Sequence, residues 1–204
     1  MKIILNACDQ ALCISMRDER IKSNRKAGRR MQIVTRNAAH DLEVNMDGVG
    51  GEVSFCKMVN IYPDTSLKPD SGWDLIHPTL GSIDVKQTRY KTGNLIIRPN
   101  QHHKIQPDVY ALMVGTFPNY RFAGWISSEV ALDKGNLGCL PGKTIINHII
   151  PQDDLFPKID CWQREYMLEN ARKKKTAQGS SHPNPPGQAE ELHSPSQSAK
   201  GHST

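Results

Sequence analysis

The chain has 204 residues, enough for one domain with a hydrophobic core, and its 26 basic and 21 acidic side chains give a formal net charge of +5. This balance suits a polyanionic partner without requiring one. No apolar run approaches the roughly 20 residues of a membrane-spanning helix, and the apolar start of the chain is too short for a secretory signal. We therefore expect a cytoplasmic protein without membrane contact.

Five cysteines are scattered along the chain without a CxxC pair and without the Cys/His spacing of a zinc site. An odd number of unclustered cysteines is typical of free thiols in a reducing compartment. They are Cys8, Cys13, Cys56, Cys139 and Cys161.

The N-terminal part of the chain predicts two helices, the first over about 6–26 and the second over about 38–60. Apolar residues recur in the second segment every three to five positions, which indicates one buried helix face. Glycines interrupt that pattern at Gly48, Gly50 and Gly51. We expect the helix to break or restart there.

Short runs rich in β-branched and aromatic residues follow from Trp73 to about Trp125 and predict strands. The runs are WDLIHP, SIDVKQT, NLIIRP, DVYALMVG and YRFAGWISS. Turns are indicated at Pro78, Gly81, Gly93, Pro107 and Pro118-Asn119. A further strand is expected over 144–150 and a closing helix over 160–173.

This order of elements predicts an α/β domain over residues 1–170, with a mixed, largely antiparallel central β-sheet flanked by helices. From residue 171 a basic run leads into a segment with almost nothing apolar. Such a segment cannot offset the entropy of ordering it, so residues 171–204 are expected to form a disordered basic and polar tail.

The strand containing Asp84 and Lys86 holds the residues with the most evident chemistry. Side chains alternate along a strand, so these two project from one face while Ile83 and Val85 project from the other. If the preceding segment folds back as a hairpin, Asp74 lies across from Asp84, with Cβ atoms about 5 Å apart. Two carboxylates that close repel unless a positive charge lies between them.

Carboxylates and water are the ligands that Mg²⁺ prefers, so the paired aspartates predict a divalent cation. A lysine at the edge of that site can orient or deprotonate a water, or stabilise charge on a phosphate. Asp74, Asp84 and Lys86 together therefore suit phosphodiester hydrolysis.

Asp74, then Asp84-Val85-Lys86 ten residues on, after a helix with Glu52 in GVGGEVSFCKMVN, resembles the PD-(D/E)XK nucleases. That superfamily contains restriction endonucleases, resolvases and phage exonucleases. The resemblance implies a restriction-endonuclease-like core and a metal-dependent deoxyribonuclease, an endonuclease or exonuclease, of a prokaryotic cell or phage-infected host. It implies that Asp74, Asp84 and the Val85 carbonyl bind Mg²⁺, or Mn²⁺ in its place. By the same resemblance, Glu52 assists the metal directly or through water, and Lys86 is the catalytic lysine.

Two details depart from the superfamily pattern. Trp73 stands where the proline that names the motif is expected. Gln106-x-x-x-Tyr110 matches the QxxxY signature of one branch, but that signature lies on a helix, whereas Pro107 and the following run predict a strand here. We therefore give the second match no weight.

Two other functional classes stay open. One is a catalytically silent nucleic-acid-binding module on the same fold, and the other is a structural or interaction protein in which the acidic pair is accidental. A nucleotide cofactor is not expected, because GCLPGKT at 138–144 lacks the first glycine of a phosphate-binding loop. DNA is the expected partner, and the superfamily includes dimers and larger rings, so the chain can be a homo-oligomer.

Overall fold

A computed structural model describes residues 1–26, 28, 38–65, 72–98, 106–133, 136–142 and 144–157. The chain divides into a unit over Met1–Met167 and a second over Leu168–Thr204. All described residues belong to the first unit. The helix expected over 160–173 and the tail expected over 171–204 lie outside them.

The chain begins with a short strand, β1 (Lys2–Ile4), followed by helix α1 (Ala7–Lys26), which confirms the first predicted helix. Asn6 and Asp9 cap that helix reciprocally. The Asp9 amide donates to Asn6 Oδ1 and the Asn6 amide donates to Asp9 Oδ2, both at 2.9 Å. This capping box satisfies two backbone donors at the helix start, which explains why the helix begins there.

Helix α2 (Ala38–Met58) is continuous, so the expected break at its glycines is wrong. These glycines allow close packing. A Cβ on Gly50 would lie 2.2 Å from the hydroxyl oxygen of Tyr120, and one on Gly51 would lie 3.1 Å from Cβ of Gln87. The helix backbone therefore approaches the sheet at a distance that only glycine permits.

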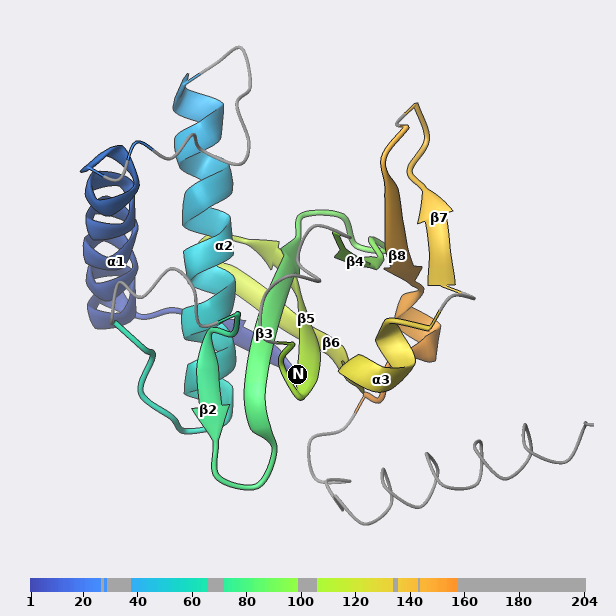
Figure 1. Ribbon diagram of the computed structural model, residues 1–204. Coiled ribbons are helices and arrows are strands. Elements are labelled where there is room, and N and C mark those ends of the chain that lie inside the picture. The colour runs from blue at the N-terminus through green and yellow to red at the C-terminus, as the bar shows by residue number, and fades with distance from the viewer. Residues whose placement is uncertain are drawn as a thin grey trace, which may run out of the picture. The chain divides into compact units, whose positions relative to one another are not determined.

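The main sheet has five strands in the order β1-β6-β5-β3-β2 (Figure 1). Its other members are β2 (Leu75–His77), β3 (Gly81–Thr88), β5 (Val109–Thr116) and β6 (Asn119–Ser127). Only β3 and β5 pair in parallel; the other three pairings are antiparallel. The mixed, largely antiparallel sheet is thus confirmed.

A second, smaller antiparallel sheet has the order β4-β8-β7. It contains β4 (Leu95–Ile97), β7 (Leu137–Cys139) and β8 (Ile146–Ile150), and a short helix α3 (Ser128–Ala131) precedes β7. The strands expected at 94–99 and 144–150 are confirmed. They pair with each other, however, and not within the central sheet.

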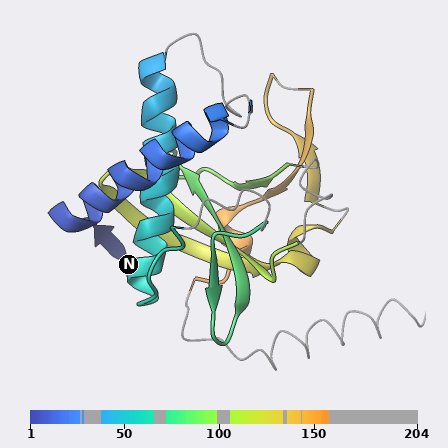
Figure 2. The same ribbon diagram turned by 60° about the vertical axis from the view of Figure 1, so that its left-hand side comes forward.

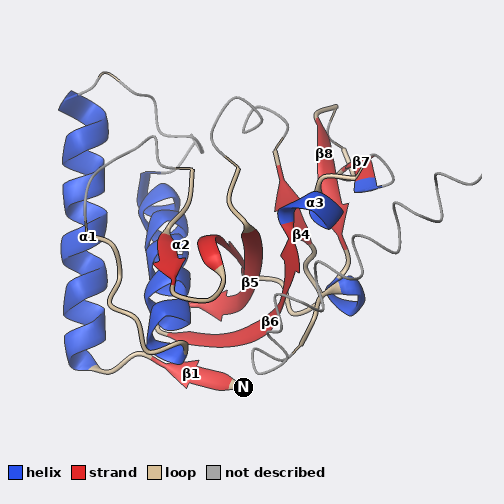
Figure 3. Ribbon diagram, turned by 60° about the horizontal axis from the view of Figure 1, so that its bottom comes forward, coloured by secondary structure: helices blue, strands red, loops and turns tan. Residues whose placement is uncertain are grey.

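The two faces of the main sheet have different covers, seen side by side in Figure 3. Helix α2 packs on one face with α1 outside it, and Figure 2 shows α1 crossing over α2. The small sheet and α3 cover the other face, where a separate apolar cluster includes Leu95, Ile97, Leu112 and Ile150. The expectation of helices flanking the sheet is therefore correct for one face only.

None of the helices in the described part of the chain is both long enough and apolar enough to cross a membrane.

Candidate functional site

The β2–β3 hairpin positions the two aspartates. Leu75 pairs with Ile83 in antiparallel register, which confirms the predicted hairpin, and Asp74 directly precedes the paired residues. The Asp74 amide donates to the carbonyl of Ile83 at 2.8 Å. The Val85 amide donates to Oδ2 of Asp74 at 2.7 Å. The Asp74 carboxylate is therefore held against the backbone of Val85.

Asp84 and Lys86 form an ion pair on one face of β3. The lysine Nζ lies 2.7 Å from Oδ1 and 2.6 Å from Oδ2, so it binds both carboxylate oxygens. Asp84 is only 7% exposed. Ile83 and Val85 point the other way and belong to the apolar cluster under α2. The predicted division of this strand into two faces is thus confirmed.

Glu52 lies on α2 and is paired with Arg20 of α1. The guanidinium donates from Nη1 to Oε1 at 2.8 Å and from Nη2 to Oε2 at 2.7 Å. This fork-to-fork geometry is the strong, directional form of an arginine–carboxylate pair. Glu52 raises the pKa of Arg20, with smaller contributions from Asp74 and Asp64. Sequence reasoning missed Arg20, because it lies 32 residues from its partner on an ordinary polar helix face.

Asp74 links the two ion pairs electrostatically. Burial raises the pKa of its carboxyl well above the usual range, and the charges of Glu52 and Asp84 raise it further. The charge of Lys86 and the Val85 amide oppose that rise. Among the described residues the two cations of the site pair with the other two acids. Asp74 is consequently the acid whose charge is least compensated.

The other three predicted side chains, those of Glu52, Asp84 and Lys86, lie on two sides of the main sheet. Val49 and Val53 of α2 share an apolar cluster with Ile83, so the Glu52 helix covers that face. Asp84 has the opposite orientation, beside Tyr110 of β5 in the parallel register. The four residues are therefore neighbours through Asp74, but they do not line one common surface.

The donor chemistry can be tested against the expected metal. Within the described ranges, no three His, Cys, Asp or Glu side chains are arranged to hold a metal ion. The ion pairs explain this, because Lys86 binds both oxygens of Asp84 and Arg20 binds both oxygens of Glu52. All of these donors are oxygens, which is the ligand type that a hard divalent cation prefers, but the described side chains do not form a three-ligand group.

Tyr110 and Gln106 are next to this site. The Tyr110 hydroxyl donates to Oε1 of Gln106 at 3.0 Å, and Tyr110 is on a strand, as Pro107 predicted. Burial, and then the charge of Asp84, raise the pKa of Tyr110 to about 12. The hydroxyl is therefore a permanent donor at neutral pH. We gave the QxxxY match no weight because its segment predicts a strand. Its two residues, Gln106 and Tyr110, nevertheless contact each other, and Tyr110 lies beside Asp84.

One sequence family covers almost all of the residues that the structure describes. A family model matches residues 2–158, which is most of the chain and includes all the predicted site residues. Comparison with curated proteins gave no match, and comparison with solved structures gave none either. The chain belongs to the family described as "Family of unknown function (DUF5843)".

Proposed function

We propose that this protein is a Mg²⁺-dependent deoxyribonuclease that hydrolyses phosphodiester bonds on a restriction-endonuclease-like core. The observation that carries the proposal is the hairpin geometry. Asp74 accepts a hydrogen bond from the Val85 amide, next to Asp84, and the ammonium of Lys86 binds the Asp84 carboxylate. Two acids can hold a divalent cation and a lysine beside them can orient a water, which suits metal-assisted hydrolysis of a phosphodiester.

The charge balance supports a cation at this place. With Asp74 ionised, Glu52, Asp74 and Asp84 would carry three negative charges against the two positive charges of Arg20 and Lys86, and without a further cation burial raises the pKa of Asp74 toward its neutral form. A buried carboxylate without a nearby cation is costly, and it raises its own pKa in response. Asp74, Asp84 and the Val85 carbonyl would hold Mg²⁺, or Mn²⁺ in its place, and Glu52 would assist directly or through water.

Each residue then has a separate task. A cation held by Asp74, Asp84 and the Val85 carbonyl would supply a water of lowered pKa and a polarised phosphoryl oxygen. Lys86, once its ammonium leaves Asp84, orients that water or stabilises charge on the phosphate. Its side chain is 22% exposed, so it can reach a ligand from solvent without leaving the sheet edge. DNA is the proposed substrate, and its polyanionic backbone suits the formal charge of +5.

A second candidate function, binding without cleavage, is supported by a different observation. Because Lys86 already binds both oxygens of Asp84, the pair also fits a permanent structural bridge. In that reading the domain binds nucleic acid, or another protein, without cleaving anything. The two readings differ in whether a divalent cation displaces the lysine.

The test is a cleavage assay on the purified full chain. Supercoiled plasmid, linear duplex and single-stranded DNA are incubated with Mg²⁺, Mn²⁺ or EDTA. The variants are Asp84→Asn, Lys86→Met and, as a matched control, Lys91→Met, which removes an exposed lysine just beyond the same strand. We expect cleavage with Mg²⁺ or Mn²⁺, none with EDTA, loss by about 100-fold or more in the first two variants, and wild-type rates in the control.

Two outcomes would contradict the proposal. If cleavage survives Asp84→Asn or Lys86→Met at the wild-type rate, the activity belongs to another site or to a contaminant. If no substrate is cut, but the wild type retards DNA with a slope in log affinity against log salt, the silent binding module is favoured.

A further inference from the structure

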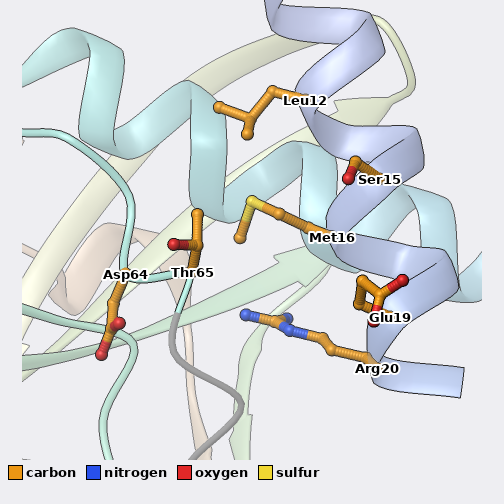
Figure 4. A pocket seen from close by; sticks show the side chains of 7 residues that line it. All are labelled: Leu12, Ser15, Met16, Glu19, Arg20, Asp64 and Thr65. Atoms are coloured by element: carbon orange, nitrogen blue, oxygen red, sulfur yellow. The ribbon is translucent and has the colours of Figure 1, made fainter. Parts of the chain in front are cut away.

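A small pocket between α1 and the segment that follows α2 is one place where a ligand could bind (Figure 4). Its charged side chains are already engaged, since Arg20 pairs with Glu52 and Glu19 pairs with Lys22. Asp64, on the opposite wall, also interacts with other residues of the chain. The charges that line the pocket are therefore balanced within the protein, and its described lining selects no charged ligand.

The turn that joins β3 to β4 has the opposite character, because it exposes an aromatic ring to solvent (Figure 1). Tyr90 is 77% exposed, more than any other large apolar residue in the described part of the chain. One exposed ring by itself needs no explanation. Here two further features accompany it, a firmly held backbone and a basic sequence.

Hydrogen bonds from two distant elements hold the backbone of this turn. Within the turn, the Gly93 amide donates to the Tyr90 carbonyl at 2.9 Å. From β6, Arg121 Nη2 donates to the Lys91 carbonyl at 2.6 Å. From the segment after β8, Gln152 Nε2 donates to the Gly93 carbonyl at 2.6 Å. The ring therefore stands on a fixed support, and its backbone needs little further ordering when a ligand binds.

The sequence around the turn is basic. Residues 85–107 contain five lysine and arginine side chains and no aspartate or glutamate. Lys86 and Arg89 pair with acids outside this stretch, and the remaining charge is spread along it, so no one of these side chains is expected to decide the affinity for a polyanion. Two exposed acids, Asp153 and Asp154, follow the glutamine that holds the turn. The surface therefore suits a polyanion that also offers flat apolar faces better than one that offers phosphates alone.

We propose that Tyr90 is a stacking platform for a base of single-stranded DNA. Every base has a flat face that can stack on an aromatic ring, whatever the sequence. A duplex already stacks these faces on one another, and unstacking them costs free energy, so a single strand is the preferred ligand.

The platform is close to the predicted site. Lys86 precedes Tyr90 by four residues, so their Cα atoms are at most about 14 Å apart, a span that a short single strand covers. The inference rests on the proposed function for the choice of DNA, and it names single-stranded DNA as the form of substrate that the site takes.

The test measures binding without metal, so that it does not depend on cleavage. The fluorescence anisotropy of a labelled single-stranded oligonucleotide is followed as the full chain is added in EDTA, with a blunt duplex of the same sequence for comparison. The variants are Tyr90→Ala, Tyr90→Leu and Tyr90→Phe. Tyr62→Ala is the matched control, because Tyr62 is also exposed, at 73%, but follows the C-terminal end of α2. The turn, in contrast, is tied to the middle of α2 by the pairing of Arg89 with Asp47.

We expect Tyr90→Ala and Tyr90→Leu each to weaken single-strand binding about tenfold, the order of the contribution of one base stacked on an aromatic ring. Tyr90→Phe keeps the ring, so it should bind within about twofold of the wild type, as should the control. The wild type should bind the duplex more weakly than the single strand. After irradiation, an oligonucleotide that carries 5-iodouracil should be crosslinked to Tyr90, as located by peptide mass spectrometry.

Several results would overturn the inference. They are wild-type affinity in Tyr90→Ala or Tyr90→Leu, no binding of single strands by the wild type, and tighter binding of the duplex, or of RNA of the same sequence, than of single-stranded DNA. Circular dichroism checks that each variant is folded, and if the alanine variant is not, the comparison of leucine with phenylalanine decides.

The failure of this inference can be distinguished from the failure of the proposed function. If single strands bind through Tyr90 but no DNA is cleaved with any metal, the proposed function fails and the stacking platform stands. If cleavage depends on Asp84 and Lys86 but Tyr90→Ala binds single strands as the wild type does, the proposed function stands and the platform fails.

Discussion

Replacing Lys86 by methionine tests the ion pair at the centre of the site. The ammonium is 2.6 and 2.7 Å from the two oxygens of Asp84, and that aspartate is 7% exposed. Methionine keeps most of the side-chain volume but leaves the carboxylate buried without a cation. Removing one partner of a buried pair costs about 3–5 kcal/mol. Because Lys86 keeps 22% exposure, we expect the lower end, about 3 kcal/mol.

The companion substitution is Asp84→Asn, which keeps the shape of the side chain. It leaves the lysine with a neutral acceptor and a route to solvent, so its cost should be smaller, about 1 kcal/mol. In the double variant Lys86→Met, Asp84→Asn no charge is buried. Its total cost should therefore lie below the cost of Lys86→Met alone.

Urea unfolding in EDTA at neutral pH measures all four free energies of unfolding, and the double-mutant cycle gives the coupling energy. A loss of 3 kcal/mol corresponds to a fall in melting temperature of roughly 6–12 °C for a chain of this size. A cost below about 1 kcal/mol for Lys86→Met, or strict additivity of the two substitutions, would show that the buried pair has no energetic role.

Three further predictions concern separate features of the fold. Asp74→Asn removes a carboxyl whose pKa is raised in the native state, so the wild type loses stability relative to the variant as pH rises above the usual aspartate range. From about pH 4 to pH 8, the urea midpoint of the variant should therefore rise relative to that of the wild type. A constant difference between the two midpoints over this range would contradict the prediction. Gly50→Ala should cost about 1–3 kcal/mol in thermal unfolding, because its Cβ would lie 2.2 Å from a tyrosine oxygen. Gly48→Ala, which meets nothing within 4 Å, should stabilise by about 1 kcal/mol. Burial raises the pKa of the Cys13 and Cys56 thiols to about 12, so both should resist alkylation of the native protein at neutral pH, and rapid labelling of either would contradict their burial.

Local patterns in the sequence predicted most of the elements. The strands between residues 73 and 127 were found because alternation and turn residues act within a few positions. The hairpin that brings Asp74 to the backbone of Val85 follows from the same local information. The strands β1 and β7 were missed, because each has only three residues. β1 pairs with β6, which lies far along the chain, and β7 pairs with β8.

Tertiary packing accounts for the errors. Glycine lowers helix propensity, yet α2 continues through its glycines because the sheet requires a close helix backbone there. The second sheet could not be distinguished from the first, since strand patterns do not say which strands pair. The same limit applied to the site. The hairpin that carries Asp74 was predicted from local patterns, whereas the contact of Arg20 with Glu52 depends on how α1 crosses α2.

Asp74 is the residue that a purely structural reading explains least well. Its one clear structural task is to accept the Val85 amide, at 2.7 Å, and asparagine would do that without a charge. When the aspartate is ionised, it carries a charge that burial and two neighbouring acids oppose, so its pKa is raised. Groups kept at such a cost are concentrated at functional sites. If Asp74→Asn is more stable than the wild type and also loses Mn²⁺ binding, then this carboxylate serves function at the expense of stability.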